Sequence, residues 1–186
     1  LINNRFAGLL RSDPSSVLDM CTGSGCIGIA TALEFDQAKV TLADISEPCI
    51  ALATDNIQLH QLEGRVTAVL SDGFGDIEGK FDLILANPPY VSDAEYRELP
   101  EEYLREPALG LISPLDGLDL PIALMKSAAK HLEDDGALIM EVGFSADALM
   151  AALPDVPFLW LEFEHGGSGV FCLTAKQLQT FSASAL

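Results

Sequence analysis

The sequence predicts an α/β fold, in which a mostly parallel sheet carries helices on both faces. One observation predicts this fold class, and a second predicts a single domain. Short β-type runs alternate with longer helical stretches along the 186 residues, which is the pattern of repeated strand–helix–strand units. Hydrophobic residues make up 49% of the chain and charged residues 20%, so a chain of single-domain length can bury one sizeable core. We therefore expect one globular domain over residues 1–186.

Strands are expected where short apolar runs end in turn residues. These runs lie at residues 16–20, 39–43, 65–70, 81–86, 136–142, 156–163 and 169–174. The run at 81–86 is almost continuously apolar, which is typical of a central parallel strand buried on both faces. The last two runs flank Gly166 and Gly167 and indicate an antiparallel hairpin that closes the sheet.

Helices are expected between the strands. The helical segments lie at residues 26–34, 47–61, 118–132 and 146–153. The second has a clear start, because Ser46 is a good N-cap and Pro48 is tolerated in a first turn. Residues 91–117 break the pattern with charges, prolines and glycine, and so long a segment predicts a functional, substrate-side insert. Residues 179–186 have a weak pattern and are expected to form a frayed tail.

The charge of the chain bears on its partner. Its 28 acidic and 10 basic residues give a net charge of −18, which would repel a phosphate backbone. We therefore expect a basic protein or a small molecule as partner and no stable nucleic-acid binding. No apolar run reaches the ~20 residues of a membrane helix, and residues 1–6 lack a secretion signal pattern. A cytoplasmic protein without membrane contact is expected.

The cysteines do not suggest a metal site. The four cysteines contain no C-x-x-C pair and form no close cluster with the three histidines. Scattered cysteines in a chain without a signal sequence are typical of reduced thiols, which mostly behave as small buried hydrophobes. We therefore expect no metal.

A glycine-rich turn follows the first strand. Gly23, Gly25 and Gly28 have the spacing of the dinucleotide fingerprint G-x-G-x-x-G. Glycines at a helix N-terminus let an anionic group, either a pyrophosphate or a carboxylate, approach backbone N–H groups, and the spacing does not choose between them. Asp44 at the end of the next strand could accept both hydroxyls of a ribose. A nucleoside cofactor site is favoured over a tight turn beside a helix-capping aspartate.

A second motif follows the strand at 81–86, on the crevice side where open α/β sheets place their chemistry. It reads Asn87-Pro88-Pro89-Tyr90. Proline lacks an N–H and holds the preceding residue extended, so the turn is rigid. The Asn87 side-chain oxygen and the Pro88 carbonyl can then converge on both protons of a planar –NH2 group. Tyr90 can stack on that group, and we favour this interpretation over a simple strand-ending turn.

These motifs resemble those of class I methyltransferases that use S-adenosylmethionine and modify planar –NH2 groups. The sequence DMCTGSGCI at 19–27 resembles their first motif, and NPPY at 87–90 resembles their catalytic motif. Nearly the whole chain is most similar to the protein-glutamine methyltransferases, which implies a Rossmann-like, seven-stranded methyltransferase sheet. One branch of that family modifies the Gly-Gly-Gln loop of peptide release factors, and the other modifies a glutamine of large-subunit ribosomal protein L three. EPALGL at 106–111 and PDVPFLWLEF at 154–163 are more similar to the ribosomal-protein branch.

The resemblance implies individual roles. Residues 21–25 would wrap the methionine part of the cofactor, Asp44 would take the ribose, and Asp72 would lie near the adenine. The release-factor branch often has an aromatic residue after the aspartate that matches Asp72, whereas Gly73 stands here, so adenine packing would pass to Phe74 or elsewhere. The implied cofactor-binding residues are Asp19, Cys21, Thr22, Gly23, Ser24, Gly25, Asp44, Ile45, Asp72, Gly73, Phe74 and Asn87, and the implied catalytic residues are Asn87, Pro88, Pro89 and Tyr90. The family's N-terminal helical domain, which helps to bind the protein substrate, is expected to be missing from this chain.

The resemblance implies methyl transfer from S-adenosylmethionine to the side-chain amide nitrogen of a glutamine in free ribosomal protein L three. Three alternatives remain open. Release factors could be the substrate instead. Methylation of adenine or cytosine amines in nucleic acid would share the Asn87 motif but conflicts with the net charge of −18. A nicotinamide-dependent oxidoreductase, or a cofactor-binding module without catalysis, is the third.

Overall fold

The computed structural model describes residues 10, 12–89, 117–163 and 167–184. Seven strands of this part of the chain form one sheet with the order β3-β2-β1-β4-β5-β7-β6. The strands are β1 (Ser16–Met20), β2 (Lys39–Asp44), β3 (Val66–Leu70), β4 (Phe81–Ala86), β5 (Leu132–Glu141), β6 (Leu159–Trp160) and β7 (Val170–Thr174). The first five strands are parallel, and β7 runs antiparallel to both β5 and β6. The predicted fold class, including the antiparallel strands at the C-terminal end, is confirmed.

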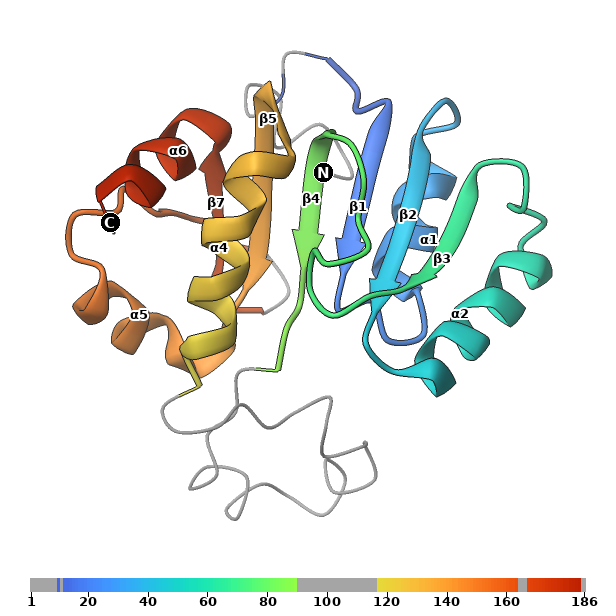
Figure 1. The fold of residues 1–186 in the computed structure, drawn as a ribbon, viewed down its shortest axis with the longest axis horizontal. Coiled ribbons are helices and arrows are strands. Elements are labelled where there is room, and N and C mark those ends of the chain that lie inside the picture. The colour runs from blue at the N-terminus through green and yellow to red at the C-terminus, as the bar shows by residue number, and fades with distance from the viewer. Residues whose placement is uncertain (1–9, 11, 90–116, 164–166, 185–186) are drawn as a thin grey trace.

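Helices cover both faces of the sheet. They are α1 (Cys26–Glu34), α2 (Glu47–Leu59), α4 (Asp119–His131), the 3-10 helix η4 (Gly143–Ser145), α5 (Ala146–Ala152) and α6 (Ala175–Ser184). Figure 1 shows α4 in front of the sheet and α1 behind it. Successive residues of β1 serve the two faces, because Val17 packs in the cluster that contains α1 whereas Leu18 packs in the cluster that contains α4. The central strands are apolar throughout because both of their faces are buried.

The bounds of β2, β3 and β7 differ from the expected ones by one residue, whereas those of β5 and β6 differ by more. β5 begins at Leu132, four residues before the expected start, because this fully buried leucine pairs with Phe81 of β4. Residues Glu133, Asp134 and Asp135 are exposed and acidic, so this part of the strand has no apolar run by which the sequence could predict it. β6 has only two residues, Leu159–Trp160, although the expected run covered 156–163.

The expectation of a frayed tail at 179–186 is wrong for residues 179–184, which belong to α6. The helix begins with a capping box: the Thr174 N–H donates to Gln177 Oε1 at 2.8 Å, and the Gln177 N–H donates to Thr174 Oγ1 at 3.4 Å. Leu178 is fully buried, and Phe181 packs against the same core cluster as α4. The weak apolar pattern was misleading because two apolar contacts suffice to dock a short helix on its neighbour.

Two further observations concern the described residues only. No helix among them is both long enough and apolar enough to cross a membrane. The expected insert at 91–117 lies outside them except for Gly117, which precedes α4.

Candidate active site

The predicted motifs meet at the carboxyl edge of the sheet. Met20 pairs with Ala43 of β2 on one side and with Ala86 of β4 on the other. The residues that follow these three, Cys21, Asp44 and Asn87, therefore lie at the same edge of the sheet. In Figure 1 the arrowhead of β4 points toward this edge. Parallel α/β sheets bind their ligands at this edge.

The buried carboxylate of Asp19 holds the glycine-rich loop in place by hydrogen bonds. Its side chain is 1% exposed, and its Oδ2 accepts hydrogen bonds from the Thr22 hydroxyl at 2.5 Å and from the Gly28 N–H at 2.8 Å. These bonds tie the loop to the first turn of α1. Burial raises the pKa of Asp19 from 3.8 to about 6, which exceeds the opposing effect of the two hydrogen bonds, and the nearby Asp44 carboxylate adds to the rise.

Asp44 connects the loop to the end of β2. Its Oδ2 accepts the Gly23 N–H at 2.9 Å, and its Oδ1 accepts the Ser46 N–H at 2.9 Å. The end of β2 is also connected to the end of β3, since the Ser71 N–H after β3 donates to the Asp44 carbonyl at 2.9 Å. Each carboxylate oxygen has a second lone-pair site. The fixed carboxylate can therefore accept two further hydrogen bonds, as a pair of ribose hydroxyls requires.

The backbone of the loop explains why glycines stand in it. Gly23 has φ +56°, and a Cβ placed on it would meet nothing within 4 Å, so this position faces open space. Gly28 serves packing instead, because a Cβ there would lie 2.2 Å from Leu42 and push α1 off the sheet. Cys21 has φ +58° without being glycine, which is a strained backbone of the kind that occurs at binding sites.

Two further side chains bear on the loop: Cys21 lies in it, and Asn56 of α2 binds its backbone. Burial raises the pKa of the Cys21 thiol to about 12, and the neighbouring Asp44 and Asp19 carboxylates contribute. The thiol is protonated at neutral pH and is not a nucleophile. Sequence reasoning missed Asn56 of α2, whose Nδ2 donates to the Ser24 carbonyl at 2.9 Å. The available signal was an asparagine in a helix interior, where this residue is unfavourable unless its side chain is used.

Asn87 has the most unusual surroundings at this edge. Among the described residues, its Oδ1 is the one buried side-chain oxygen or nitrogen without a hydrogen-bond partner. A buried acceptor that lacks a donor costs about 1–3 kcal/mol, so this oxygen is suited to an incoming N–H group. Pro88 follows as a buried residue and Pro89 as a half-buried one, whereas Tyr90 lies outside the described residues.

The structure does not bring Phe74 to this edge. Its ring packs on His131, with 4.7 Å between the ring centroids. His131 ends α4, and the next residue, Leu132, pairs with Phe81 at the start of β4, so this contact lies at the amino edge of the sheet. Asp72 is exposed after β3, and Gly73 beside it has φ +54°.

Ile45 offers the apolar surface that Phe74 does not. It directly follows Asp44 and is 56% exposed. An exposed apolar side chain beside the Asp44 carboxylate suits the face of a planar base.

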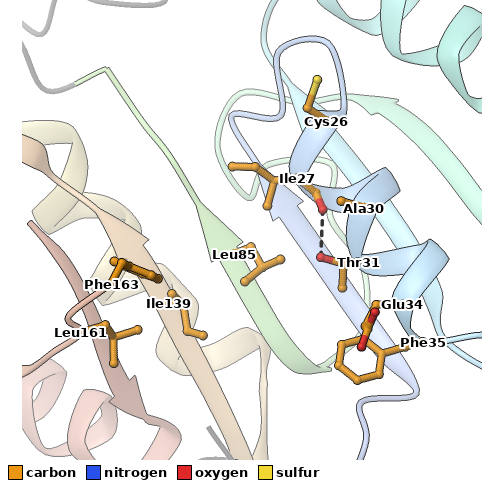
Figure 2. Close-up of a pocket in the computed structure, with 10 residues that line it drawn as sticks. All are labelled: Cys26, Ile27, Ala30, Thr31, Glu34, Phe35, Leu85, Ile139, Leu161 and Phe163. Carbon is orange, nitrogen blue, oxygen red and sulfur yellow. Dashed lines mark hydrogen bonds between the residues drawn. The ribbon is translucent and has the colours of Figure 1, made fainter. Parts of the chain in front are cut away.

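A separate apolar pocket lies on the α1 face of the sheet, with a volume of about 370 Å³. Figure 2 shows it between α1 and the side chains of Leu85, Ile139, Leu161 and Phe163. The hydroxyl of Thr31 in its wall already donates to the Ile27 carbonyl at 2.8 Å. A ligand site for chemistry needs convergent polar groups, and this pocket presents almost none. The described residues also hold no group of three or more His, Cys, Asp or Glu side chains that could bind a metal ion.

Comparisons with known proteins agree on a class of enzyme. The model of the methyltransferase small domain matches residues 6–108. A curated protein of Francisella tularensis, "Ribosomal protein uL3 glutamine methyltransferase", is 49% identical over 181 residues, which are 96% of this chain and 58% of that protein. A protein of Neisseria gonorrhoeae with the same name is 44% identical over 88% of this chain and 54% of its own length. The chain thus spans little more than half the length of these relatives.

The fold comparison gives the same architecture. A methyltransferase from Pyrococcus furiosus superposes with a TM-score of 0.62 at 20% identity, over 86% of this chain and 74% of that structure. At this identity the likeness establishes the fold.

Proposed function

Because this chain belongs to the methyltransferase small domain family, we propose that it methylates the side-chain amide nitrogen of a glutamine in ribosomal protein uL3, with S-adenosylmethionine as methyl donor. Here uL3 denotes large-subunit ribosomal protein L three. The names of the two curated relatives support the choice of substrate. The observation that carries the proposal is the buried Asn87 Oδ1, an acceptor without a donor at the edge where the glycine-rich loop and Asp44 meet.

The residues at this edge fit S-adenosylmethionine. The open space at Gly23 leaves room for the methionine part along residues 21–25. The Asp44 carboxylate would accept the ribose hydroxyls, while Ile45 and Asp72 would contact the adenine and its nitrogens. When bound, the cofactor supplies an electrophilic methyl group on a positively charged sulfur.

Asn87 and Pro88 would hold the acceptor. The nitrogen lone pair of a glutamine amide is delocalised into its carbonyl, which makes the nitrogen a poor nucleophile. If Asn87 Oδ1 and the Pro88 carbonyl each accept one N–H, the nitrogen is aimed in a single direction. Orientation of this kind contributes up to ~7–11 kcal/mol of barrier reduction. The two oxygens also favour the partial positive charge that grows on the nitrogen.

No dedicated base is required in this mechanism. After methyl transfer the nitrogen is strongly acidic, so its proton can leave to solvent. The two acceptor oxygens release one hydrogen bond in that step. The histidines therefore have no proposed part in the chemistry, and no metal is proposed.

The net charge of the chain supports a basic protein as its partner. A net charge of −18 attracts a basic protein and disfavours stable binding to nucleic acid. We extend the proposal to a cytoplasmic enzyme that acts on free uL3 and does not bind membranes.

Mass spectrometry tests the proposal. The full-length protein is incubated with labelled S-adenosylmethionine and, in parallel, with free uL3, a peptide release factor and a DNA oligonucleotide. We expect one methyl group on a glutamine of uL3. Faster transfer to the release factor would assign the protein to the other branch, and transfer to adenine or cytosine would refute the proposal.

A further inference from the structure

Phe144 is the most exposed large hydrophobic side chain of the described residues, at 86%. Single exposed apolar residues are common and by themselves mean little. What distinguishes Phe144 is the rigid backbone that carries it and the position of that backbone beside the candidate active site.

The backbone around Phe144 is held tightly. Phe144 lies in η4, directly after β5, and the Ser145 N–H donates to the Val142 carbonyl at 3.0 Å. The Val142 N–H in turn donates to the Gly169 carbonyl at 2.7 Å. A Cβ on Gly169 would lie 2.1 Å from the Gly143 oxygen, so the two backbones are in contact with no room for a side chain. Phe144 therefore projects from a fixed turn.

That turn lies beside Asn87. Ala86 of β4 pairs with Met140 of β5, so Asn87 is the neighbour of Glu141, and Phe144 comes three residues later. With about 4.8 Å between strands and at most about 3.6 Å per residue, the two Cα atoms are within about 16 Å of each other. A peptide with its glutamine at Asn87 reaches this distance within about five residues.

We propose that Phe144 is a specificity residue, which packs on an apolar side chain of the protein substrate within about five residues of the acceptor glutamine. This inference rests on the proposed function. A phenylalanine suits the task because it offers a large apolar surface and loses little conformational freedom on contact. Because backbone hydrogen bonds hold the turn, Phe144 is already positioned for this contact in the free chain.

The test is a kinetic comparison with free uL3 as substrate. Phe144→Ala should raise KM about tenfold, with kcat within twofold of wild type and unchanged affinity for S-adenosylmethionine by calorimetry. Phe144→Tyr should retain the wild-type KM. Leu59→Ala is the matched control, because Leu59 is 73% exposed at the far end of α2, and its KM should not change.

Variants of the substrate test whether Phe144 contacts one particular side chain of uL3. With wild-type enzyme, alanine replacement of each apolar residue of uL3 within five positions of the methylated glutamine should identify one whose loss raises KM by a similar factor. In Phe144→Ala the same replacement should add little, because one contact cannot be lost twice.

Several results would overturn the inference. An unchanged KM for Phe144→Ala in an enzyme that methylates uL3 would refute it and leave the proposed function standing. An equal rise in KM for Leu59→Ala would show a nonspecific effect. A change in oligomeric state on ultracentrifugation, with KM unchanged, would assign Phe144 to contact between copies of the chain. Absence of glutamine methylation by wild type would refute both proposals.

Discussion

At the scale of single residues, the two aspartates of the site differ in surroundings and therefore in expected role. Asp19 is buried and its Oδ2 accepts two hydrogen bonds from the loop itself. Asp44 is half-buried, and each of its oxygens accepts one backbone N–H. Asp19 thus shapes the loop, whereas Asp44 has acceptor capacity left for a ligand.

Asp44→Ala tests the ligand role. A charge-assisted hydrogen bond contributes about 1.5–3 kcal/mol, so its loss should weaken binding of S-adenosylmethionine tenfold or more. Calorimetry measures the affinity, and Asp55→Ala, an exposed aspartate of α2, is the control. An Asp44→Ala variant that is folded and binds normally would contradict the assignment.

Asn87→Ala separates chemistry from stability. The variant should lose at least about 100-fold in the rate of methyl transfer, because a preorganised acceptor is removed. Its thermal unfolding should change little, since the Asn87 Oδ1 has no hydrogen-bond partner within the described part of the chain to lose. Gln58→Ala, on the exposed side of α2, serves as the control in both measurements. Near-normal activity, or a large drop in Tm, would argue against the catalytic role.

The raised pKa of Asp19 predicts a pH-dependent stability. Between about pH 4 and pH 6 the native state holds a proton that the unfolded chain, with its ordinary value of 3.8, has released. The free energy of unfolding therefore falls as pH rises through this window, and the loss is complete at about pH 7, one unit above the native pKa. Its size is on the order of 2–3 kcal/mol.

Denaturant titrations of wild type and Asp19→Asn measure this effect, because the other acidic groups are common to both proteins and cancel in the difference. Relative to wild type, Asp19→Asn should gain stability as pH rises from 4 to 7. Parallel curves for the two proteins would mean that the carboxyl is not protonated in this range.

At the scale of elements, hydrogen bonds and close packing hold the candidate site in place. Asn56 of α2 binds the loop carbonyl of Ser24, and the missing side chain of Gly28 lets α1 approach β2. The bounds of α1 and β4 match the sequence prediction because their patterns end in strong local signals, a glycine turn before α1 and Asn87-Pro88 after β4. β5 and α6 departed from prediction because their ends depend on contacts with α4 and β4.

Leu178→Ala tests the docking of α6. The side chain is fully buried, and truncation of such a leucine costs about 2–5 kcal/mol. The neighbouring Gln179 is exposed, so Gln179→Ala should leave the free energy of unfolding within about 0.5 kcal/mol of wild type. Equal effects of the two substitutions would show that α6 is frayed in solution.

At the scale of the whole molecule, charge is expected to govern the choice of substrate form. The net charge of −18 on these 186 residues is expected to attract a free basic protein. When uL3 is embedded in ribosomal RNA, the surrounding phosphates are expected to repel the acidic chain.

The kinetics of free and assembled substrate test this expectation. kcat/KM for free uL3 should fall as salt is raised from 0.1 M to 1 M, because the screening length shortens from ~10 Å to ~3 Å. Mature large subunits should be methylated weakly at any salt concentration. A short uncharged peptide around the glutamine is the control and should show little salt dependence. Equal turnover on free uL3 and on mature subunits would refute the electrostatic explanation.

The sequence by itself determined the order of the seven strands and of α1, α2, α4 and α5, the glycine-rich loop, Asp44 at the end of β2 and the rigid turn at Asn87. These features arise from local chemistry, namely apolar periodicity, glycine at positive φ and the missing N–H of proline. Each of them can be predicted from a residue and its near neighbours in the sequence.

The tertiary structure alone decided which groups are satisfied and where side chains point. The Asn56 bond to the loop, the contact of Phe74 with His131 and the fixed turn under Phe144 each join segments far apart in the chain. Conversely, no described segment supplies a donor to the buried Asn87 Oδ1. The pairing of such segments depends on how whole elements pack, and local residue preferences do not determine that packing. A burial pattern predicts that a residue is inside, whereas its partners are set by the sheet register and the helices above it.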